Sequence, residues 1–250
     1  MTNRTVRRAL GAVTLASLAL TAVLALWVSP ADATQGDAMR LLYLHVPCAW
    51  LAYLAFFVTA VASVLWLIPR TRAPIWDLLA GASAEVGVIF TGLMLAMGSL
   101  WAKPIWGTWW EWDARLTTTA VLFFLYLGYL ALRRTADTAD ARGKRCAIAA
   151  LIAFADVPLV HFSVTWWQTL HQQGTVFNEK MQVEIHGSMA FTLLLGVASF
   201  TLLYAYLVVR RMSLLQLEEG LEERELAQAI AERLAQEGAD VPSGVQMETV

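Results

Sequence analysis

Six long apolar stretches constrain the fold of this chain more than any other feature of its sequence. They cover residues 10–28, 41–68, 78–101, 117–132, 146–162 and 187–209. A bilayer core about 30 Å thick is crossed by a helix of roughly 20 apolar residues, and several stretches reach that length. The chain is 58% hydrophobic and only 15% charged, which is typical of membrane proteins. The sequence therefore predicts an all-α, polytopic membrane protein with six transmembrane helices.

The first apolar stretch has the charge pattern of a signal peptide. It follows Arg4, Arg7 and Arg8, but we find no convincing small-residue cleavage site after it. We therefore expect a signal anchor that is retained as the first transmembrane helix.

Lysine and arginine are unevenly divided between the two sides of the expected bundle. Twelve flank one set of helix ends: Arg4, Arg7, Arg8, Arg70, Arg72, Arg133, Arg134, Arg142, Lys144, Arg145, Arg210 and Arg211. The alternate segments carry only four: Arg40, Lys103, Arg115 and Lys180. Because cytoplasmic loops are enriched in Lys and Arg, both termini are expected in the cytoplasm.

The composition changes after the last apolar stretch, which divides the chain into residues 1–211 and a tail, 212–250. From Ser213 onward there are nine acidic residues and two basic ones. Apolar residues recur near helical spacing among them: Leu214, Leu217, Leu221, Ile230 and Leu234. This pattern predicts a cytoplasmic amphipathic helix that ends around Gly238. Its acidity disfavours an anionic lipid surface, and it is either a solvated extension or a docking site for a cytoplasmic partner.

The two cysteines do not suggest redox chemistry. Cys48 and Cys146 are expected near opposite faces of the membrane, and the chain has no Cys-x-x-Cys pair. A disulfide within the chain is therefore excluded by the expected topology.

Four tryptophans lie within seven residues of the expected outer loop 101–117, in the segment Trp106-Gly-Thr-Trp-Trp-Glu-Trp112. Indoles also collect at membrane interfaces without binding anything, and Trp27, Trp66, Trp76 and Trp101 fit such a belt. A belt spreads over both interfaces, whereas this cluster shares one side with Trp166 and Trp167 of the loop 163–186. The pattern favours a surface that holds a flat apolar ligand, built from Trp106, Trp109, Trp110 and Trp112.

All four histidines are expected on the same outer side as these tryptophans. Neutral imidazole beside an aromatic surface is what haem iron requires. His45 lies within an apolar stretch beside Pro47, and His171 follows the second tryptophan pair, so these two are the predicted iron ligands. For His161 and His186, interfacial packing or hydrogen bonding is the favoured interpretation.

Two charged residues follow the tryptophan cluster directly. Arg115, like Lys103, is a candidate partner for a haem propionate, because guanidinium binds carboxylate in a bidentate manner. Alternatively, Asp113 and Arg115 start the fourth helix, where an acidic residue is favoured. Both interpretations stay open.

Glu85 and Asp156 are expected at membrane depth, where they have a structural role or belong to a proton or ion path. The chain has no phosphate-binding loop, nucleophile elbow or His-Glu-x-x-His zinc motif. An ATPase or hydrolase activity is therefore not supported.

The segment Trp106–Asp113 resembles the tryptophan-rich WWD signature of haem-handling proteins. Its continuation Ala114-Arg115-Leu116-Thr117 resembles the CcmC family of cytochrome c maturation. Three further segments match that family's pattern: Trp101-Ala-Lys-Pro104, His45-Val-Pro47 and Trp166-Trp-Gln-Thr-Leu-His-Gln172. Together they span about residues 40–190.

The resemblance implies haem b bound by His45 and His171 on an outward-facing surface formed by Trp106, Trp109, Trp110, Trp112, Asp113 and Arg115. It implies delivery of that haem to a periplasmic haem chaperone, CcmE, whose covalent loading the chain would assist. The small membrane protein CcmD and the ABC transporter subunits CcmA and CcmB are the other implied partners, in the bacterial inner membrane. The acidic tail departs from the shorter terminus expected of the family.

Two other functions compete with haem delivery. A b-type electron-transfer subunit would bury its haem deep between helices, whereas these histidines are expected at one interface. A transmembrane haem transporter could use the glycines of the third stretch (Gly81, Gly87, Gly92 and Gly98) to line a path, although small residues more often allow close helix packing.

Overall fold

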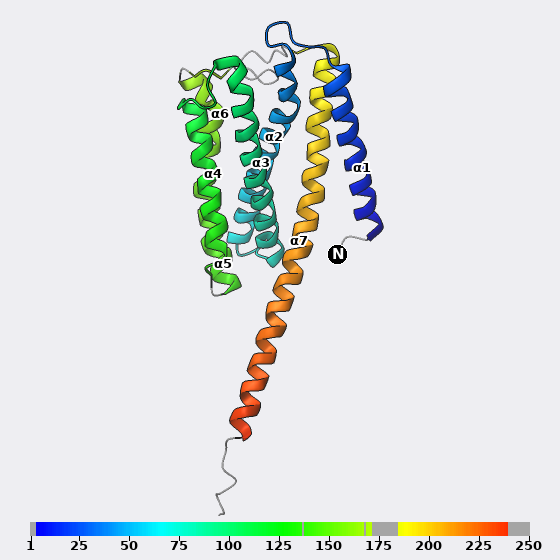
Figure 1. Ribbon diagram of the computed structural model, residues 1–250. Coiled ribbons are helices and arrows are strands. Elements are labelled where there is room, and N and C mark those ends of the chain that lie inside the picture. The colour runs from blue at the N-terminus through cyan, green and yellow to red at the C-terminus, as the bar shows by residue number, and fades with distance from the viewer. Residues whose placement is uncertain (1–3, 137, 168, 172–184, 240–250) are drawn as a thin grey trace, which may run out of the picture.

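The computed structural model describes residues 4–136, 138–167, 169–171 and 185–239, which form a helical bundle with one projecting helix (Figure 1). Its helices are α1 (Arg4–Val23), the π-helical η1 (Leu24–Val28), the 3-10 helix η2 (Asp37–Leu41), α2 (Leu42–Leu67), α3 (Pro74–Trp106), α4 (Ala114–Arg133), α5 (Ala139–Phe154), α6 (Asp156–Trp166) and α7 (Gly187–Ala239).

Six helical segments are long and apolar enough to cross a membrane, which confirms the predicted all-α, six-span fold. The first combines α1 with η1, the second combines η2 with α2, and the fifth combines α5 with α6. The apolar runs identified each span, but the helices extend beyond most of them. The fifth span, for example, covers Ala139–Trp166 rather than 146–162.

The fifth span is interrupted at Ala155, where α5 ends and α6 begins. Pro158 lies in the first turn of α6, where a missing backbone N–H is tolerated because first-turn N–H groups have no partner within their helix. A proline in an uninterrupted helix would clash with the carbonyl one turn earlier. The break at Ala155 therefore accommodates Pro158. The Oδ2 atom of Asp156 is buried and has no hydrogen-bond partner among the described residues.

The α2–α3 pair forms the centre of the bundle, with α4, α5 and α6 packed on one side and α1 and α7 on the other (Figure 1). Phe56 of α2 stacks on Tyr126 of α4 with ring centroids 3.7 Å apart. A Cβ atom at Gly87 of α3 would lie only 2.6 Å from the Phe56 ring. Glycine at this position therefore allows α2 and α3 to approach closely.

Ion pairs join the helices at the end of the bundle where the chain begins. Arg133 donates to both carboxylate oxygens of Asp77, at 2.7 and 3.1 Å. Arg142 bridges Asp77, at 2.9 Å, and Glu219, at 2.5 Å. These contacts link α3, α4, α5 and α7.

A second ion pair at this end connects Arg211 of α7 with Glu85 of α3. Glu85 is thus neutralised by a partner from a neighbouring helix, which favours the structural interpretation of this acidic residue over a place in an ion path.

The helix α7 continues through residue 212 and projects from the bundle to Ala239 (Figure 1). Residues 212–239 are rich in Ala, Leu and Glu, which are strong helix formers, and include no proline. The apolar residues expected on one face are exposed: Leu214, Leu217, Leu221, Ile230 and Leu234. Because α7 is continuous past residue 212, this part of the tail is not a separate helix. That it acts as a cytoplasmic amphipathic helix stays a prediction.

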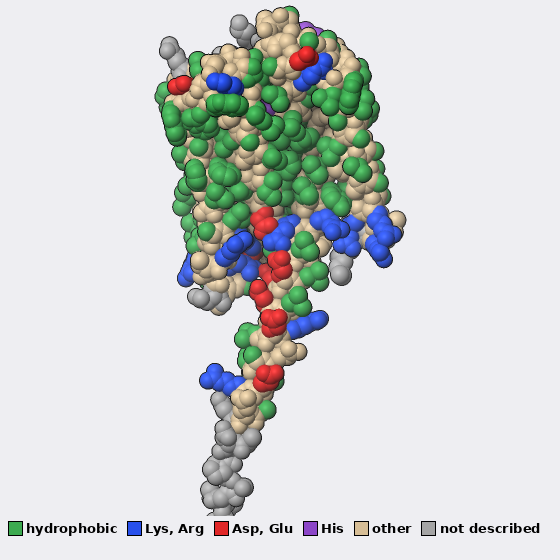
Figure 2. Space-filling model, viewed as in Figure 1, with side chains coloured by type: hydrophobic (Ala, Val, Ile, Leu, Met, Phe, Trp, Pro, Cys, Tyr) green, Lys and Arg blue, Asp and Glu red, His purple; other side chains and the backbone are tan. Residues whose placement is uncertain are grey.

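Charge is concentrated at one end of the apolar body of the bundle. Figure 2 shows most of the Lys and Arg side chains near the end where the chain begins, and His side chains at the opposite end. That opposite end carries η2, the start of α2 and the end of α3. Lys180, residues 172–184 of the His171 loop and residues 240–250 of the tail lie outside the described residues.

Cys48 and Cys146 are both buried free thiols in different core clusters, in agreement with the expectation that they do not form a disulfide.

Candidate functional site

The tryptophan-rich segment is only partly a loop. The helix α3 continues through Pro104 to Trp106 and ends at Gly107, whose φ of 77° is the left-handed conformation that glycine favours at helix C-termini. Lys103 donates from Nζ to the Gly107 carbonyl oxygen at 2.9 Å. The expected loop 101–117 is therefore corrected to residues 107–113, with its ends absorbed into α3 and α4.

Asp113 is the N-cap of α4 and also a hydrogen-bond partner of His171. Its Oδ1 accepts from the backbone N–H of Leu116 at 2.7 Å, and its Oδ2 lies 3.1 Å from His171 Nδ1. The side chain is only 6% exposed. The two alternatives for Asp113, a helix start and a site residue, are thus compatible.

His171 lies between this carboxylate and an indole ring. Its ring meets Trp106 edge-on, with centroids 4.9 Å apart. Burial lowers the pKa of His171 below its usual value of 6.5, and the hydrogen bond to Asp113 partly offsets that shift. Because Nδ1 faces a carboxylate, Nε2 is the nitrogen left for a metal, which is the usual arrangement around metal-binding histidines.

His45 lies in the first turn of α2 and faces α3. Its ring contacts Trp101 edge-on, with centroids 5.8 Å apart. A Cβ atom at Gly98 would lie 3.0 Å from His45 Cε1, so glycine makes room for the imidazole. The buried Nδ1 of His45 makes no hydrogen bond of normal geometry within the part of the chain that the structure describes.

These two histidines line one small cavity of about 90 Å³. It is bounded by Gln35, His45, Gly98, Trp101, Ala102, Ile105, Trp106, Leu170 and His171. The structure therefore brings together three predicted site residues from three different segments: His45, Trp106 and His171. Pockets that enclose a drug-sized ligand measure about 300–1,000 Å³, so this cavity could take only part of a larger molecule.

Several cavity residues were not predicted as haem-site residues. Trp101 was assigned to the interfacial belt, and the structure shows that it also packs on His45 and donates from Nε1 to Gln35 Oε1 at 3.0 Å. Gly98, Trp101 and Ile105 recur at helical spacing and share a face of α3. That spacing was the signal that could have identified them, whereas nothing in the sequence indicated Gln35.

The other three tryptophans of the cluster lie beside the cavity rather than in its wall. Trp109 and Trp112 are 54% and 76% exposed, respectively. Trp110 packs edge-on against Trp112, with centroids 5.4 Å apart. Lys103 Nζ lies 5.9 Å from the Trp109 ring centroid. Trp109 and Trp112 therefore expose aromatic area on the segment that directly follows the cavity residue Trp106, whereas Trp110 is partly buried and its Nε1 has no hydrogen-bond partner among the described residues.

Arg115 connects helices and does not line the cavity. Its Nη2 donates to the His161 carbonyl at 3.0 Å, and its Nε lies 3.5 Å from Ser163 Oγ. These bonds connect α4 to α6. The contacts of Arg115 are therefore those of a residue that holds helices together, and its role as a propionate partner stays a prediction.

His161 itself packs near Tyr53 and Phe162, and His186 is exposed before α7. Neither histidine lines the cavity.

Comparison with known proteins identifies relatives that cover most of the chain. The model of the CcmC family, described as heme exporter protein C, matches residues 1–227. "Heme exporter protein C" of Escherichia coli K12 is 41% identical over 184 residues, which cover 74% of this chain and 73% of the relative.

Two further relatives extend this picture. The Haemophilus influenzae protein of the same name is 37% identical over 225 residues, 88% of each chain. A "putative cytochrome c biosynthesis ccmC-like mitochondrial protein" of Marchantia polymorpha is 41% identical over 182 residues, 73% of this chain and 75% of the relative. The chain belongs to the CcmC, or heme exporter protein C, family.

Proposed function

We propose that this chain takes part in haem export for cytochrome c maturation by holding haem b at the His45–His171 cavity and presenting it to a partner. Family membership supports the general role, since relatives are named for heme export and cytochrome c biosynthesis. The observation that carries the specific proposal is the convergence of His45 and His171 on one cavity. Haem iron accepts one or two axial imidazoles, and these are the two that line the cavity.

The chemistry of the donor set fits haem iron. Asp113 orients His171 and leaves its Nε2 for a metal, while His45 is buried beside Trp101 with Nδ1 unpaired among the described residues. A carboxylate hydrogen-bonded to a ligating imidazole fixes the ring and raises its basicity. Both thiols lie in helix-packing clusters and neither lines this cavity, so noncovalent haem b is the form we propose.

The small cavity and the exposed indoles support presentation rather than storage. A cavity of about 90 Å³ cannot enclose a porphyrin, so most of the ring would rest outside it. Trp109 and Trp112 offer exposed aromatic area on the segment that follows the cavity residue Trp106, and Trp110 packs against Trp112. A haem held this way keeps an edge accessible, and we propose that the periplasmic chaperone CcmE receives it, with CcmD, CcmA and CcmB as further partners.

The charge distribution supports an extracytoplasmic site. The Lys- and Arg-rich end of the bundle is expected in the cytoplasm, and the histidines lie at the other end. We propose that both termini are cytoplasmic, in a bacterial inner membrane, and that the haem cavity opens on the outer face.

The glycines of α3 do not favour a transport path. Cβ atoms at Gly81, Gly87, Gly92 and Gly98 would meet side chains of Arg133, Phe56, Phe123 and His45, respectively. These glycines therefore serve close packing, and the proposal rests on haem presentation at one end of the bundle.

Visible absorption of the purified protein titrated with haemin tests the ligand assignment. We expect a low-spin, bis-histidine Soret spectrum that His45→Ala or His171→Ala weakens, because each removes one axial nitrogen. His186→Ala is the matched control, since that histidine is exposed and outside the cavity. An unchanged spectrum in both cavity variants contradicts the proposal, as does equal loss in the control.

A further inference from the structure

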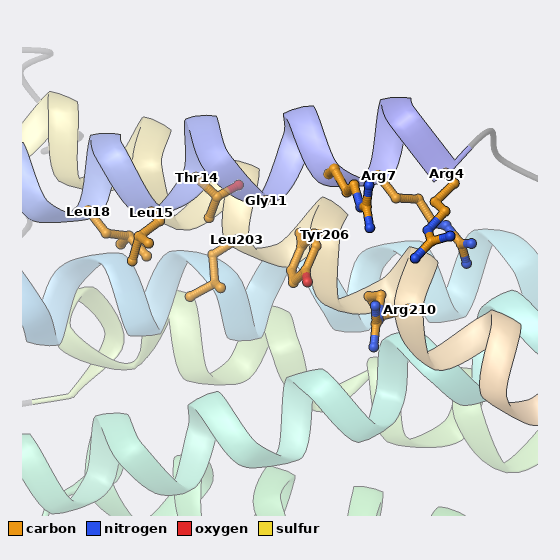
Figure 3. Close-up of a pocket in the computed structure, with 10 residues that line it drawn as sticks. Arg4, Arg7, Gly11, Thr14, Leu15, Leu18, Leu203, Tyr206 and Arg210 are labelled. Carbon is orange, nitrogen blue, oxygen red and sulfur yellow. The ribbon is translucent and has the colours of Figure 1, made fainter.

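A second cavity, of about 620 Å³, lies between α1 and α7 at the end of the bundle where the chain begins (Figure 3). Its wall consists of Arg4, Arg7, Arg8, Gly11, Thr14, Leu15, Leu18, Leu203, Tyr206 and Arg210. The haem-site residues lie at the other end of the bundle, so this cavity is separate from the proposed function.

Four guanidinium groups gather at one end of this cavity. Figure 3 shows Arg4 and Arg7 extending from α1 toward Tyr206 and Arg210 of α7. None of the four arginines, Arg8 included, forms an ion pair or hydrogen bond with another described residue. The neighbouring Arg211, in contrast, pairs with Glu85 and Glu218. The charges that face the cavity are thus left for a ligand from outside the described chain.

The rest of the cavity becomes apolar along the helix axes. Leu15 and Leu18 of α1 and Leu203 of α7 line it farther from the chain start (Figure 3). Tyr206 lies between the two regions, and its hydroxyl has no hydrogen bond within the described residues. A Cβ atom at Gly11 would come 3.1 Å from the Tyr206 ring, so the two helices meet closely there. The cavity is therefore amphipathic, with a cationic end and an apolar end.

We propose that this cavity binds one anionic phospholipid, with its phosphate at the arginines and an acyl chain along the leucines. Guanidinium binds phosphate in a bidentate manner, and basic pockets between transmembrane helices on the cytoplasmic side bind anionic head groups. The volume falls within the roughly 300–1,000 Å³ range of ligand pockets. The leucines place the acyl chain parallel to the helices, which is the direction of lipid chains in a bilayer.

The bound lipid would also stabilise the position of α1. This helix is the least buried of the six spans, and it packs mainly on α7. A phosphate shared by arginines of α1 and α7 would relieve their mutual repulsion, so the lipid acts as a bridge between the two helices.

Native mass spectrometry of the full-length protein in detergent tests this site with dioleoyl-phosphatidylglycerol and dioleoyl-phosphatidylcholine at equal concentration. We expect one phosphatidylglycerol retained with roughly tenfold preference, the factor that one charge-assisted hydrogen bond contributes. The triple variant Arg4→Gln/Arg7→Gln/Arg210→Gln should lose this preference. The triple variant Arg134→Gln/Lys144→Gln/Arg145→Gln removes the same charge outside the cavity and should retain it.

A second variant keeps every arginine, and therefore the positive charge that sets the orientation of α1 in the membrane. Leu15 is 71% exposed, so Leu15→Trp should fold, and its indole should obstruct the acyl chain and reduce phosphatidylglycerol retention. Three outcomes overturn the proposal. The unmodified protein could retain both lipids equally, the two triple variants could lose the preference equally, or Leu15→Trp could retain phosphatidylglycerol fully. Displacement of phosphatidylglycerol by haemin, dependent on the same arginines, assigns the cavity to haem propionates instead and also overturns it.

Discussion

At the scale of single residues, Asp113 is the position where helix formation and the proposed haem site depend on the same side chain. One oxygen caps α4 and the other holds His171. The sequence predicted the helix start as one alternative, and the family resemblance placed Asp113 in the haem surface, but neither predicted its hydrogen bond to His171. The position of His171 shows that Asp113 has both roles, the helix cap and the histidine partner. That position could not be predicted because His171 lies in a loop whose sequence has no periodic pattern.

Substitutions at Asp113 should separate these two roles. Asp113→Asn keeps an N-cap acceptor, so its stability should change by only a few tenths of a kcal/mol, whereas Asp113→Ala should cost about 1 kcal/mol. Both should weaken haem binding, because His171 loses its carboxylate partner. Thermal unfolding and haemin titration measure the two effects. Asp113→Asn with unchanged haem affinity would show that the carboxylate does not support the ligand.

The same substitution makes a pH prediction. The Asp113 hydrogen bond raises the pKa of His171 against the lowering effect of burial. Removal of the carboxylate should therefore lower that pKa further. In pH titrations of the haem-free protein followed by NMR, protonation of His171 should occur at lower pH in Asp113→Asn than in the unmodified protein. Protonation at higher pH in Asp113→Asn contradicts the assignment of this hydrogen bond.

At the scale of helices, the apolar runs located each span, but they did not determine where helices end or which faces meet. The helix α3 continues through Pro104, and the fifth span is broken at Ala155. Both details depend on neighbouring helices and caps. The face of α3 that meets His45 was likewise not predicted, because helix rotation depends on packing partners rather than on hydropathy.

Gly98 of α3 offers a test of that packing. A methyl group there would lie 3.0 Å from His45 Cε1, so Gly98→Ala should displace the imidazole and weaken haem binding severalfold, about 1 kcal/mol. Gly128 of α4 is the matched control, since a Cβ atom there meets nothing within 4 Å. Gly128→Ala should leave haem binding unchanged. Soret titrations compare the two variants, and equal affinities would contradict the close approach of α3 to His45.

At the scale of the whole molecule, the sequence predicted the number of spans, the division of charge between the two ends and the end at which the histidines lie. It also predicted His45 and His171 as ligands of one iron, which requires the two to lie together, but it did not predict the other walls of their cavity, such as Gln35, because these depend on how α2, α3 and the His171 segment converge. It also separated the tail from the last span, whereas α7 is one continuous helix whose Glu219 pairs with Arg142 of α5 and whose Glu218 pairs with Arg211 of the same helix.

Truncation of α7 should show which part of this helix supports the bundle. Removal of residues 228–250, beyond the segment that matches the family, leaves the Arg142–Glu219 and Arg211–Glu218 pairs intact. Thermal stability should therefore stay the same. Removal of residues 213–250 eliminates both acidic partners and leaves the half-buried Arg142 without one of its two carboxylates, at a cost of about 1–3 kcal/mol. Thermal unfolding of the three chains in one detergent measures the difference.

Glu219→Gln in the full chain should reproduce part of the loss, whereas Glu223→Gln, in the exposed part of α7, should not. Equal stability of all the chains would mean that the Arg142–Glu219 pair does not hold α7 against the bundle, which would then depend on apolar packing and on the Arg211–Glu85 pair that every chain retains.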